Sequence, residues 1–199
     1  YHEKSKLNLT CLVPKNLLFI SSTKGENVFF RGEYKKTILI NQAIKEEPKY
    51  ALFSAGSQVS LKYAKTFTKK GTTIIDNSSA FRMNPKYKLI IPEVNINIIN
   101  KKDKIISNPN CSTIQMVLPL ALIHRKYNIK RIVVSTYQAV TGSGKRGVNQ
   151  LESEKKNEKI YEKIYKKKIY ENVIPQCDEF EKNGNTKEEE KIIQETNKI

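Results

Sequence analysis

The apolar and polar stretches of the first half of the chain predict short strands, tight turns and one amphipathic helix. Apolar runs at 17–20 and 27–30 indicate two short strands, separated by a polar turn. A third apolar run, 50–56, ends in a Ser-Ala-Gly turn before a helix over about 59–70, which Gly71 ends. The apolar run 72–76 forms the next strand. Because these strands lack polar alternation, we expect parallel strands buried on both faces.

Around position 110 the pattern changes from short strands to a long apolar helix. The segments KLIIPEVN and KIISNPN each predict a short strand that leads into a loop. The following stretch, STIQMVLPLALIHRKY, reads as a mostly buried helix that is kinked at Pro119.

The rest of the chain predicts two strands and two helices. The segment RIVVSTYQAV (131–140) is a strong strand candidate, and NVIPQ (172–176) a further strand or extended segment. Between them a Gly-rich turn leads into a long charged helix, in which Ile160 and Ile164 repeat at four-residue spacing beside Tyr161 and Tyr165. The tail from Thr186 is helical, with Thr186 as N-cap and acidic residues in its first turn.

Composition narrows the class of protein. The 199 residues contain 38% hydrophobic residues, which is enough for a packed core. The net charge of +16 invites a nucleic-acid partner, but the charge is mostly lysine and is spread along the whole chain. Nucleic-acid binders more often concentrate arginine and aromatic residues on one face, so we expect no nucleic-acid partner.

Other features of the sequence point to a reducing cytoplasm. No apolar stretch is long enough to span a bilayer, and we expect no membrane association. Three cysteines at wide, unrelated spacing give neither a metal pattern nor a disulfide framework. The chain starts and stops without an evident terminal element, and we therefore expect a fragment.

Cys111 is the first candidate for chemistry. It follows Asn108-Pro109-Asn110 at the predicted start of a helix, where unpaired N–H groups stabilise a thiolate. Backbone N–H groups there could also hold the oxyanion of a thioester intermediate. From spacing alone, a buried and inert thiol is the favoured interpretation, since free cysteine is a common core residue and many cysteines at helix starts are inert.

Four motifs together resemble the aspartate-semialdehyde dehydrogenases: SNPNCSTIQM, VVSTYQAVTGSG, IIDNSSAFRM and IPEVN. LFSAGSQVS and the tail from 171 extend the likeness, which covers the chain from about Leu17 onward, with the motifs in the family's order. The related acyl-phosphate reductases of arginine biosynthesis carry Asn-Pro-Gly-Cys, so Asn110 favours the aspartate enzyme.

The resemblance implies an α/β protein with two parts. Residues 1–107 would be the remnant of a Rossmann-like NAD(P)-binding domain, and residues 108–199 part of an α+β catalytic and dimerisation domain. It also implies a homodimer that uses NADP to convert aspartyl phosphate reversibly to aspartate semialdehyde and phosphate. Cys111 would attack the acyl phosphate and carry the acyl-thioester.

The resemblance also implies roles for other residues. Gln138 would orient the substrate, Glu188 would face its amino group, and Arg82 and Lys191 would bind phosphate. By spacing alone, Glu188 and Lys191 make an ordinary i,i+3 salt bridge on a helix. The cofactor contacts implied are Ser22, Thr23, Ser54, Gly56, Thr141 and Gly142; no metal is implied.

Two parts of the family pattern are missing from the sequence. No Gly-rich pyrophosphate loop precedes Leu17, and the family's histidine base would lie beyond residue 199. His124 is about 20 Å from Cys111 along a helix, so we expect a helix-surface histidine. Cys11 and Cys177 read as packing residues. We therefore expect this chain alone to be inactive. Two alternatives to a part of the active enzyme stay open: an inactive remnant of the enzyme, and a basic interaction protein.

Overall fold

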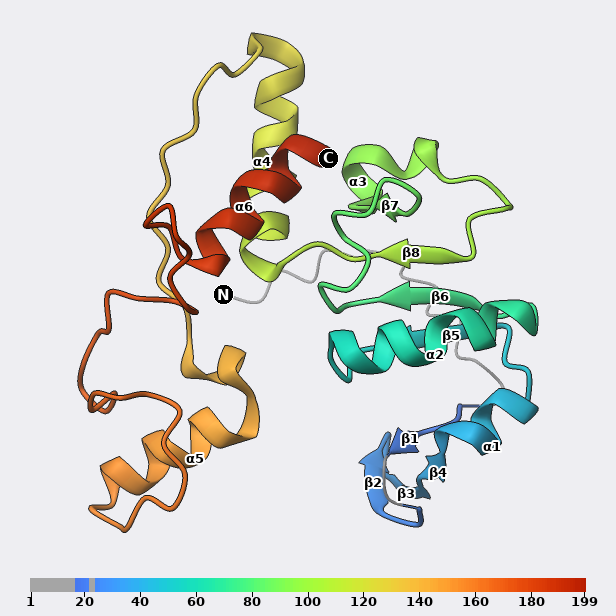
Figure 1. The fold of residues 1–199 in the computed structure, drawn as a ribbon, viewed down its shortest axis with the longest axis horizontal. Coiled ribbons are helices and arrows are strands. Elements are labelled where there is room, and N and C mark those ends of the chain that lie inside the picture. The colour runs from blue at the N-terminus through green and yellow to red at the C-terminus, as the bar shows by residue number, and fades with distance from the viewer. Residues whose placement is uncertain (1–16, 22–23) are drawn as a thin grey trace.

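A four-stranded parallel sheet organises the first half of this computed structural model, which describes residues 17–21 and 24–199 (Figure 1). Its strands lie in the order β5-β6-β8-β7, and each neighbouring pair is parallel. The strands are β5 (Tyr50–Phe53), β6 (Thr73–Asp76), β7 (Lys88–Leu89) and β8 (Ile105–Ser107). The predicted parallel sheet is confirmed, and the chain is of mixed α/β class.

Helix α2 (Ser57–Lys69) covers one face of this sheet. Ala64 and Phe67 are fully buried, and the ring of Phe67 meets Phe53 of β5 edge to face at 5.5 Å. Glycines bound the helix: Gly56 precedes it at φ 91° and Gly71 follows it at φ 92°, backbone conformations that favour glycine. The helix and strand predicted over 59–76 are thus confirmed.

The second face of the sheet differs from the prediction of strands buried on both faces. Tyr50, Leu52 and Ile75 are exposed, whereas their neighbours Ala51, Phe53 and Ile74 are buried. The strands therefore alternate between a face packed against α2 and a face that the described residues leave open. Period-two burial arises because only one layer of helix is packed on the sheet.

Two small strand pairs precede the sheet. Strand β1 (Ile20–Ser21) runs parallel to β4 (Ile38–Leu39), and β2 (Asn27–Phe30) runs antiparallel to β3 (Glu33–Lys36). Helix α1 (Ile40–Lys45) follows, and its Ala43 joins the core. The strand predicted at 27–30 is confirmed, but only Ile20 of the run 17–20 is in a strand.

Helices α4 and α6 lie side by side next to the sheet (Figure 1). Helix α4 (Cys111–Tyr127) contains Pro119 and ends at Asn128, which has left-handed backbone angles. Helix α6 (Lys187–Lys198) begins at Thr186 with a capping box, in which Thr186 and Glu189 bond each other's backbone N–H groups. Both helices were predicted, but α4 is not the mostly buried helix expected, since Leu122 and Tyr127 are exposed and only Thr113 and Val117 of its described residues are buried. Between the strands β7 and β8 lie the short helices α3 (Pro92–Asn95) and η1 (Ile96–Ile98).

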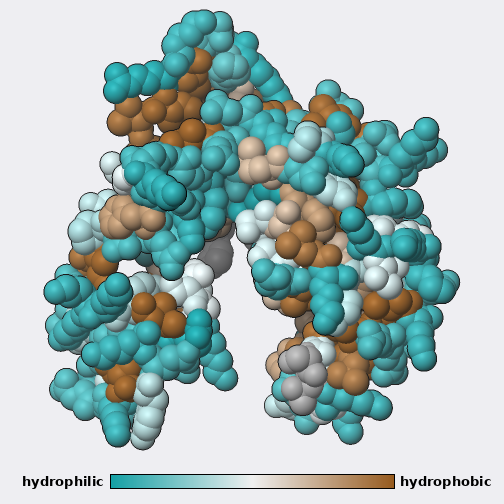
Figure 2. Space-filling model, in the orientation of Figure 1, coloured by the Kyte–Doolittle hydropathy of each residue, from teal (hydrophilic) through white to brown (hydrophobic). Residues whose placement is uncertain are grey.

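The strand predicted at 131–140 was wrong. This segment is extended but has no strand beside it among the described residues. Val133 is 79% exposed and Tyr137 88%, and hydrophobic surface is visible at this upper left part of the molecule in Figure 2. A β-branched sequence favours strand geometry, but a strand forms only when its backbone groups are paired. Residues 172–176 likewise form no strand.

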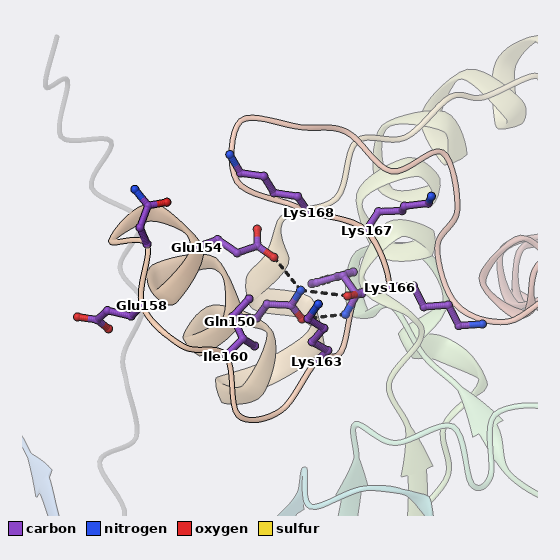
Figure 3. A pocket seen from close by; sticks show the side chains of 10 residues that line it. Gln150, Glu154, Glu158, Ile160, Lys163, Lys166, Lys167 and Lys168 are labelled. Carbon is purple, nitrogen blue, oxygen red and sulfur yellow. Dashed lines mark hydrogen bonds between the residues drawn. The ribbon is translucent and has the colours of Figure 1, made fainter.

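The long charged helix was also a wrong prediction. After η2 (Val140–Ser143), helix α5 (Gly144–Lys155) stops, and Asn157 turns the chain with φ 54°. Residues 158–171 fold back irregularly beside α5, around a cavity of about 400 Å³ (Figure 3).

Side chains of α5 hold this returning segment. The side-chain oxygen Oε1 of Gln150 accepts from the backbone N–H groups of Ile164 and Tyr165. Oε2 of Glu154 accepts from the backbone N–H groups of Ile169 and Tyr170. These bonds replace the helical ladder that the four-residue spacing predicted.

The described part of the chain contains neither a membrane-spanning helix nor a metal-binding cluster of side chains. None of its helices is both long and apolar enough to cross a bilayer. Across residues 17–21 and 24–199, no group of three or more histidine, cysteine or acidic side chains could hold a metal ion.

Candidate active site

Cys111 is the first residue of α4, as the sequence predicted, and its side chain is exposed. Strand β8 ends at Ser107, and Asn108-Pro109-Asn110 turns the chain into the helix. The N-cap Asn110 accepts from the N–H of Ser112 at 2.8 Å, and the Asn110 carbonyl accepts from Ile114. The thiol lies 3.9 Å from Oδ1 of Asn110. The Ser112 N–H is thus committed to the cap, which leaves the oxyanion to other N–H groups of the first turn.

Asn110 connects the cysteine to helix α6. Its side-chain amide donates to Glu188 at 3.0 Å, and its backbone N–H donates to Glu195 at 2.6 Å. Glu188 and Glu195 are two helical turns apart on α6 and therefore lie on one face. Both carboxylates are buried, with 7% and 1% exposure. The start of α4 is accordingly fixed by two acidic side chains from the neighbouring helix.

Glu188 brings together three of the residues that the resemblance implied. Oε1 of Glu188 accepts from the side-chain amide of Gln138 at 3.1 Å, and Oε2 lies 3.3 Å from Nζ of Lys191. The i,i+3 ion pair of Glu188 and Lys191 is therefore formed. Through the hydrogen bond between Glu188 and Asn110 it is connected to the start of α4.

Asp178 is a second partner of Lys191, at 2.8 Å. Burial acts to lower the pKa of Lys191, but the hydrogen bond and negative charge of Asp178, together with Glu188, raise it overall. Burial likewise acts to raise the pKa of Asp178, but bonds from Lys191 and the Glu179 N–H lower it overall. Lys191 therefore carries its charge throughout the neutral range, as an anion-binding lysine must.

Arg82 lies behind the cysteine loop and is 7% exposed. Its Nη1 pairs with Glu195 at 2.9 Å and its Nη2 donates to the carbonyl of Asn77 at 2.9 Å. The Nε atom is buried without a hydrogen-bond partner. Arg82 is thus oriented by a carboxylate, and its Nε–H remains as a donor.

Glu195 is the site residue that the sequence analysis missed. A carboxylate in a charged helix most often lies in solvent, and only its contacts with Arg82 and Asn110 reveal its burial. The available signal was its spacing of seven residues from Glu188, which places both on one helix face.

A cavity of about 1100 Å³ opens beside the cysteine. It lies between α4 and the extended segment 129–142, and its lining includes Cys111, Gln138, Thr141 and Gly142. Thr141 and Gly142 belong to η2, which follows the Gln138 segment directly. The structure therefore places two of the expected cofactor residues in the same cavity as the thiol.

The other expected cofactor residues lie at the carboxyl edge of the sheet. Ser54 follows β5, and Gly56 precedes α2. Asn77, after β6, donates to Ser54 at 3.5 Å, and Asn108, after β8, donates to Asn77 at 2.7 Å. This polar edge, where parallel strands end, is where open α/β sheets bind dinucleotides. Ser22 and Thr23 lie outside the described residues.

Cys177 is not the packing residue that the sequence predicted. It is exposed, in a loop next to Asp178 rather than in a core. Partial burial raises the pKa of its thiol, the carboxylates of Glu188 and Asp178 raise it further, and Lys191 opposes them. The thiol is therefore close enough to Glu188, Asp178 and Lys191 for their charges to change its pKa. Cys11 lies outside the described residues.

His124 lies near the far end of α4 and is exposed. Its carbonyl accepts from the N–H of Asn128 at the helix end. The expected helix-surface position is confirmed.

Comparison with known proteins finds two family models along the chain. The model described as semialdehyde dehydrogenase, NAD binding domain, matches residues 13–102, and that described as semialdehyde dehydrogenase, dimerisation domain, matches residues 120–199. The first match covers strands β1 to β7 and the second covers helices α5 and α6, while Cys111 lies between the two matches.

Individual relatives agree with the family models. The aspartate-semialdehyde dehydrogenase of Aquifex aeolicus is 43% identical over 89% of this chain. That of Bacillus subtilis is 42% identical over 92% of this chain. A crystal structure of aspartate semialdehyde dehydrogenase II from Vibrio cholerae superposes with a TM-score of 0.85, at 37% identity over 93% of this chain. The chain covers 54%, 56% and 58%, respectively, of these three proteins.

Proposed function

Because this chain belongs to the aspartate-semialdehyde dehydrogenase family, an oxidoreductase family, we propose that its thiol site carries out the reaction of that family. The reaction is the reversible reductive dephosphorylation of L-aspartyl-4-phosphate to L-aspartate 4-semialdehyde, with NADP as the redox partner. The product serves lysine, threonine and methionine biosynthesis.

The contact network around Asn110 is the observation that carries this proposal. It joins the start of the Cys111 helix to Glu188, and through Glu188 to Gln138 and Lys191. A nucleophile, an amide, an acid and a lysine thus belong to one contact network, although they come from three distant parts of the sequence, and the nucleophile and the amide line one cavity.

Acyl transfer to Cys111 is the first half of the proposed chemistry. The thiolate attacks the acyl carbon, a C–S bond forms, and the bond from that carbon to the phosphate oxygen breaks. Phosphate leaves with the electron pair, and the acyl group remains as a thioester. Lys191 and Arg82 provide positive charge for the departing phosphate, Lys191 with its ammonium group and Arg82 with its guanidinium group.

Substrate orientation falls to Gln138 and Glu188 in this proposal. Glu188, which is buried, attracts the substrate ammonium group, and the amide of Gln138 binds a polar group of the acyl chain. Their hydrogen bond at 3.1 Å keeps the two side chains in a fixed relation before substrate arrives.

The residues at the sheet edge and in the cavity fit a nicotinamide dinucleotide. Ser54 and Gly56 stand at the carboxyl edge of the parallel sheet, and Thr141 and Gly142 line the cavity that contains the thiol. When bound, NADPH supplies the hydride that reduces the thioester. We assign Ser22 and Thr23 to the adenosine 2′-phosphate, which distinguishes NADP from NAD.

The division of the chain and its assembly are part of the same proposal. Residues 1–107 contribute to dinucleotide binding and residues 108–199 to catalysis and dimerisation, with a homodimer as the functional unit. The match of 120–199 to a dimerisation domain supports this assignment. Sedimentation of the purified protein over a range of concentrations tests it, and a monomer at all concentrations contradicts it.

A single-turnover experiment tests the acyl transfer without the hydride step. The protein is mixed with aspartyl phosphate that an aspartate kinase generates in place, and mass spectrometry of the peptides locates the aspartyl thioester. We expect no complete turnover from this chain alone, but we expect the first half-reaction, acylation at Cys111 with stoichiometric phosphate release, and none in Cys111→Ser. Cys177→Ser is the matched control and keeps the adduct. A folded protein that releases no phosphate and shows no adduct at Cys111 contradicts the proposed function.

A further inference from the structure

Glu195 is an almost fully buried carboxylate, with 1% exposure. Its two oxygens bind two different groups. Oε1 pairs with Nη1 of Arg82 at 2.9 Å, and Oε2 accepts from the backbone N–H of Asn110 at 2.6 Å. A carboxylate at this depth is stable only when both oxygens are satisfied, and here they are.

The second contact distinguishes Glu195 from a plain buried ion pair. Asn110 is the N-cap of α4, and the next residue is Cys111. Glu188 binds the side-chain amide of the same asparagine, so the backbone and side chain of Asn110 are each held by one acid from α6. Helix α6 therefore holds both the backbone and the side chain of the residue before the cysteine.

We propose that Glu195 is a positioning residue of the thiol site, which ties Arg82 and the backbone of Asn110 together and so holds Cys111 at the start of α4. The role of Glu195 rests on the proposed function, because it matters for chemistry only where Cys111 is the nucleophile. Glu195 itself touches neither the thiol nor a group that reacts.

The geometry predicts that an amide cannot replace this carboxylate. Glutamine offers one acceptor oxygen, whereas Arg82 and the Asn110 N–H are both donors. In Glu195→Gln the oxygen stays with the charged Arg82, because a charge-assisted bond is stronger. The amide NH₂ then faces the N–H of Asn110, and the peptide before Cys111 shifts. If Arg82 is also changed to methionine, the glutamine oxygen is free to accept from Asn110 again.

The experiment uses a background in which Cys11 and Cys177 are serine, so that Cys111 is the one thiol of the chain. Two readouts are followed: the rate of Cys111 alkylation by iodoacetamide at pH 7, and the ¹H–¹⁵N signal of Asn110. We expect Glu195→Gln to slow alkylation about tenfold and to move the Asn110 amide proton strongly upfield, because its short bond to a carboxylate is lost. Glu190→Gln removes the same charge from a partly exposed site of α6, where Glu190 binds Asn183 and Asn185 rather than Asn110, and leaves both readouts unchanged.

The variant Arg82→Met with Glu195→Gln restores both readouts if Glu195 positions the loop. If it recovers the melting temperature but neither readout, Glu195 serves stability alone and the proposal is overturned. Wild-type values of both readouts in a folded Glu195→Gln protein also overturn it. Should Glu195→Gln fail to fold, the double variant decides, since it carries no unpaired buried charge. Neither readout uses substrate or dinucleotide, so a missing acyl adduct contradicts the proposed function without affecting this result.

Discussion

The side-chain amide of Asn110 donates a hydrogen bond of 3.0 Å to Glu188, 78 residues further along the chain. The same oxygen of Glu188 accepts from Gln138. One buried acceptor therefore links the start of the cysteine helix to the segment that carries the glutamine, and both partners depend on α6 for their positions.

Gln138→Ala should impair acyl transfer while leaving the fold intact. Gln138 is exposed and its side chain bonds Glu188, so its loss changes the free energy of unfolding by no more than about 0.5 kcal/mol. Losing one orienting hydrogen bond should slow formation of the Cys111 thioester about tenfold, as a mass-spectrometric time course measures. Lys130→Ala, in the same exposed region, is the control. Equal rates for wild type and Gln138→Ala would remove Gln138 from the site.

The pH dependence of Cys177 follows from its surroundings. In a variant whose Cys11 and Cys111 are serine, half-maximal alkylation of Cys177 should lie above pH 9.0, the ordinary value, because burial raises its pKa and the nearby carboxylates add to the effect. The thiol is thus protonated and unreactive at neutral pH. Glu188→Gln removes one of these charges and should lower the midpoint, whereas Glu190→Gln should not. A midpoint at or below 9.0 in the parent variant would contradict this electrostatic picture.

Thr186→Ala should loosen the helix that carries the acidic residues. Thr186 accepts from the N–H of Glu189, and the Glu189 carboxylate accepts from the N–H of Thr186. Loss of such an N-cap costs about 1 kcal/mol of the free energy of unfolding, measurable by urea denaturation. Thr68→Ala, whose exposed hydroxyl donates to a carbonyl within α2, should cost much less. Equal losses for the two variants would show that the capping box is not important.

Phe67→Ala should be the most damaging of the changes considered. The ring is fully buried against Phe53, and truncation of a buried phenylalanine costs about 3–5 kcal/mol. Leu61→Ala lies on the same helix but at 53% exposure, so it should cost below about 1 kcal/mol. Urea denaturation of both variants measures the difference. A similar loss for Leu61→Ala would mean that α2 covers the sheet differently.

Local sequence predicts those parts of this protein that depend on neighbouring residues. The start of α4 follows from Asn110 as N-cap, and the start of α6 follows from Thr186, since each cap satisfies N–H groups within three residues. The parallel sheet follows from apolar strands alternating with α2. Cys111 is located for the same reason, because its place at a helix start is a local property.

Features that depend on residues far apart in the chain could not be predicted from the local sequence. The segment 131–140 has a strand-like sequence, but a strand also needs a neighbour, which the local pattern cannot supply. The spacing of Ile160 and Ile164 suggests a helix, yet Gln150 binds the backbone of that region instead. Glu195 resembles a surface acid until Arg82, 113 residues away, is placed against it.

The exposed segment 131–137 also determines how the protein behaves in a concentrated solution. Within the described part of the chain its backbone has no strand partner, and Val133, Val134 and Tyr137 are all exposed. An open, apolar strand-like edge promotes association between chains and aggregation. Lysine substitutions at Val133 and Tyr137 should therefore keep the isolated chain soluble; because both residues line the cavity beside Cys111, they suit the urea denaturation measurements.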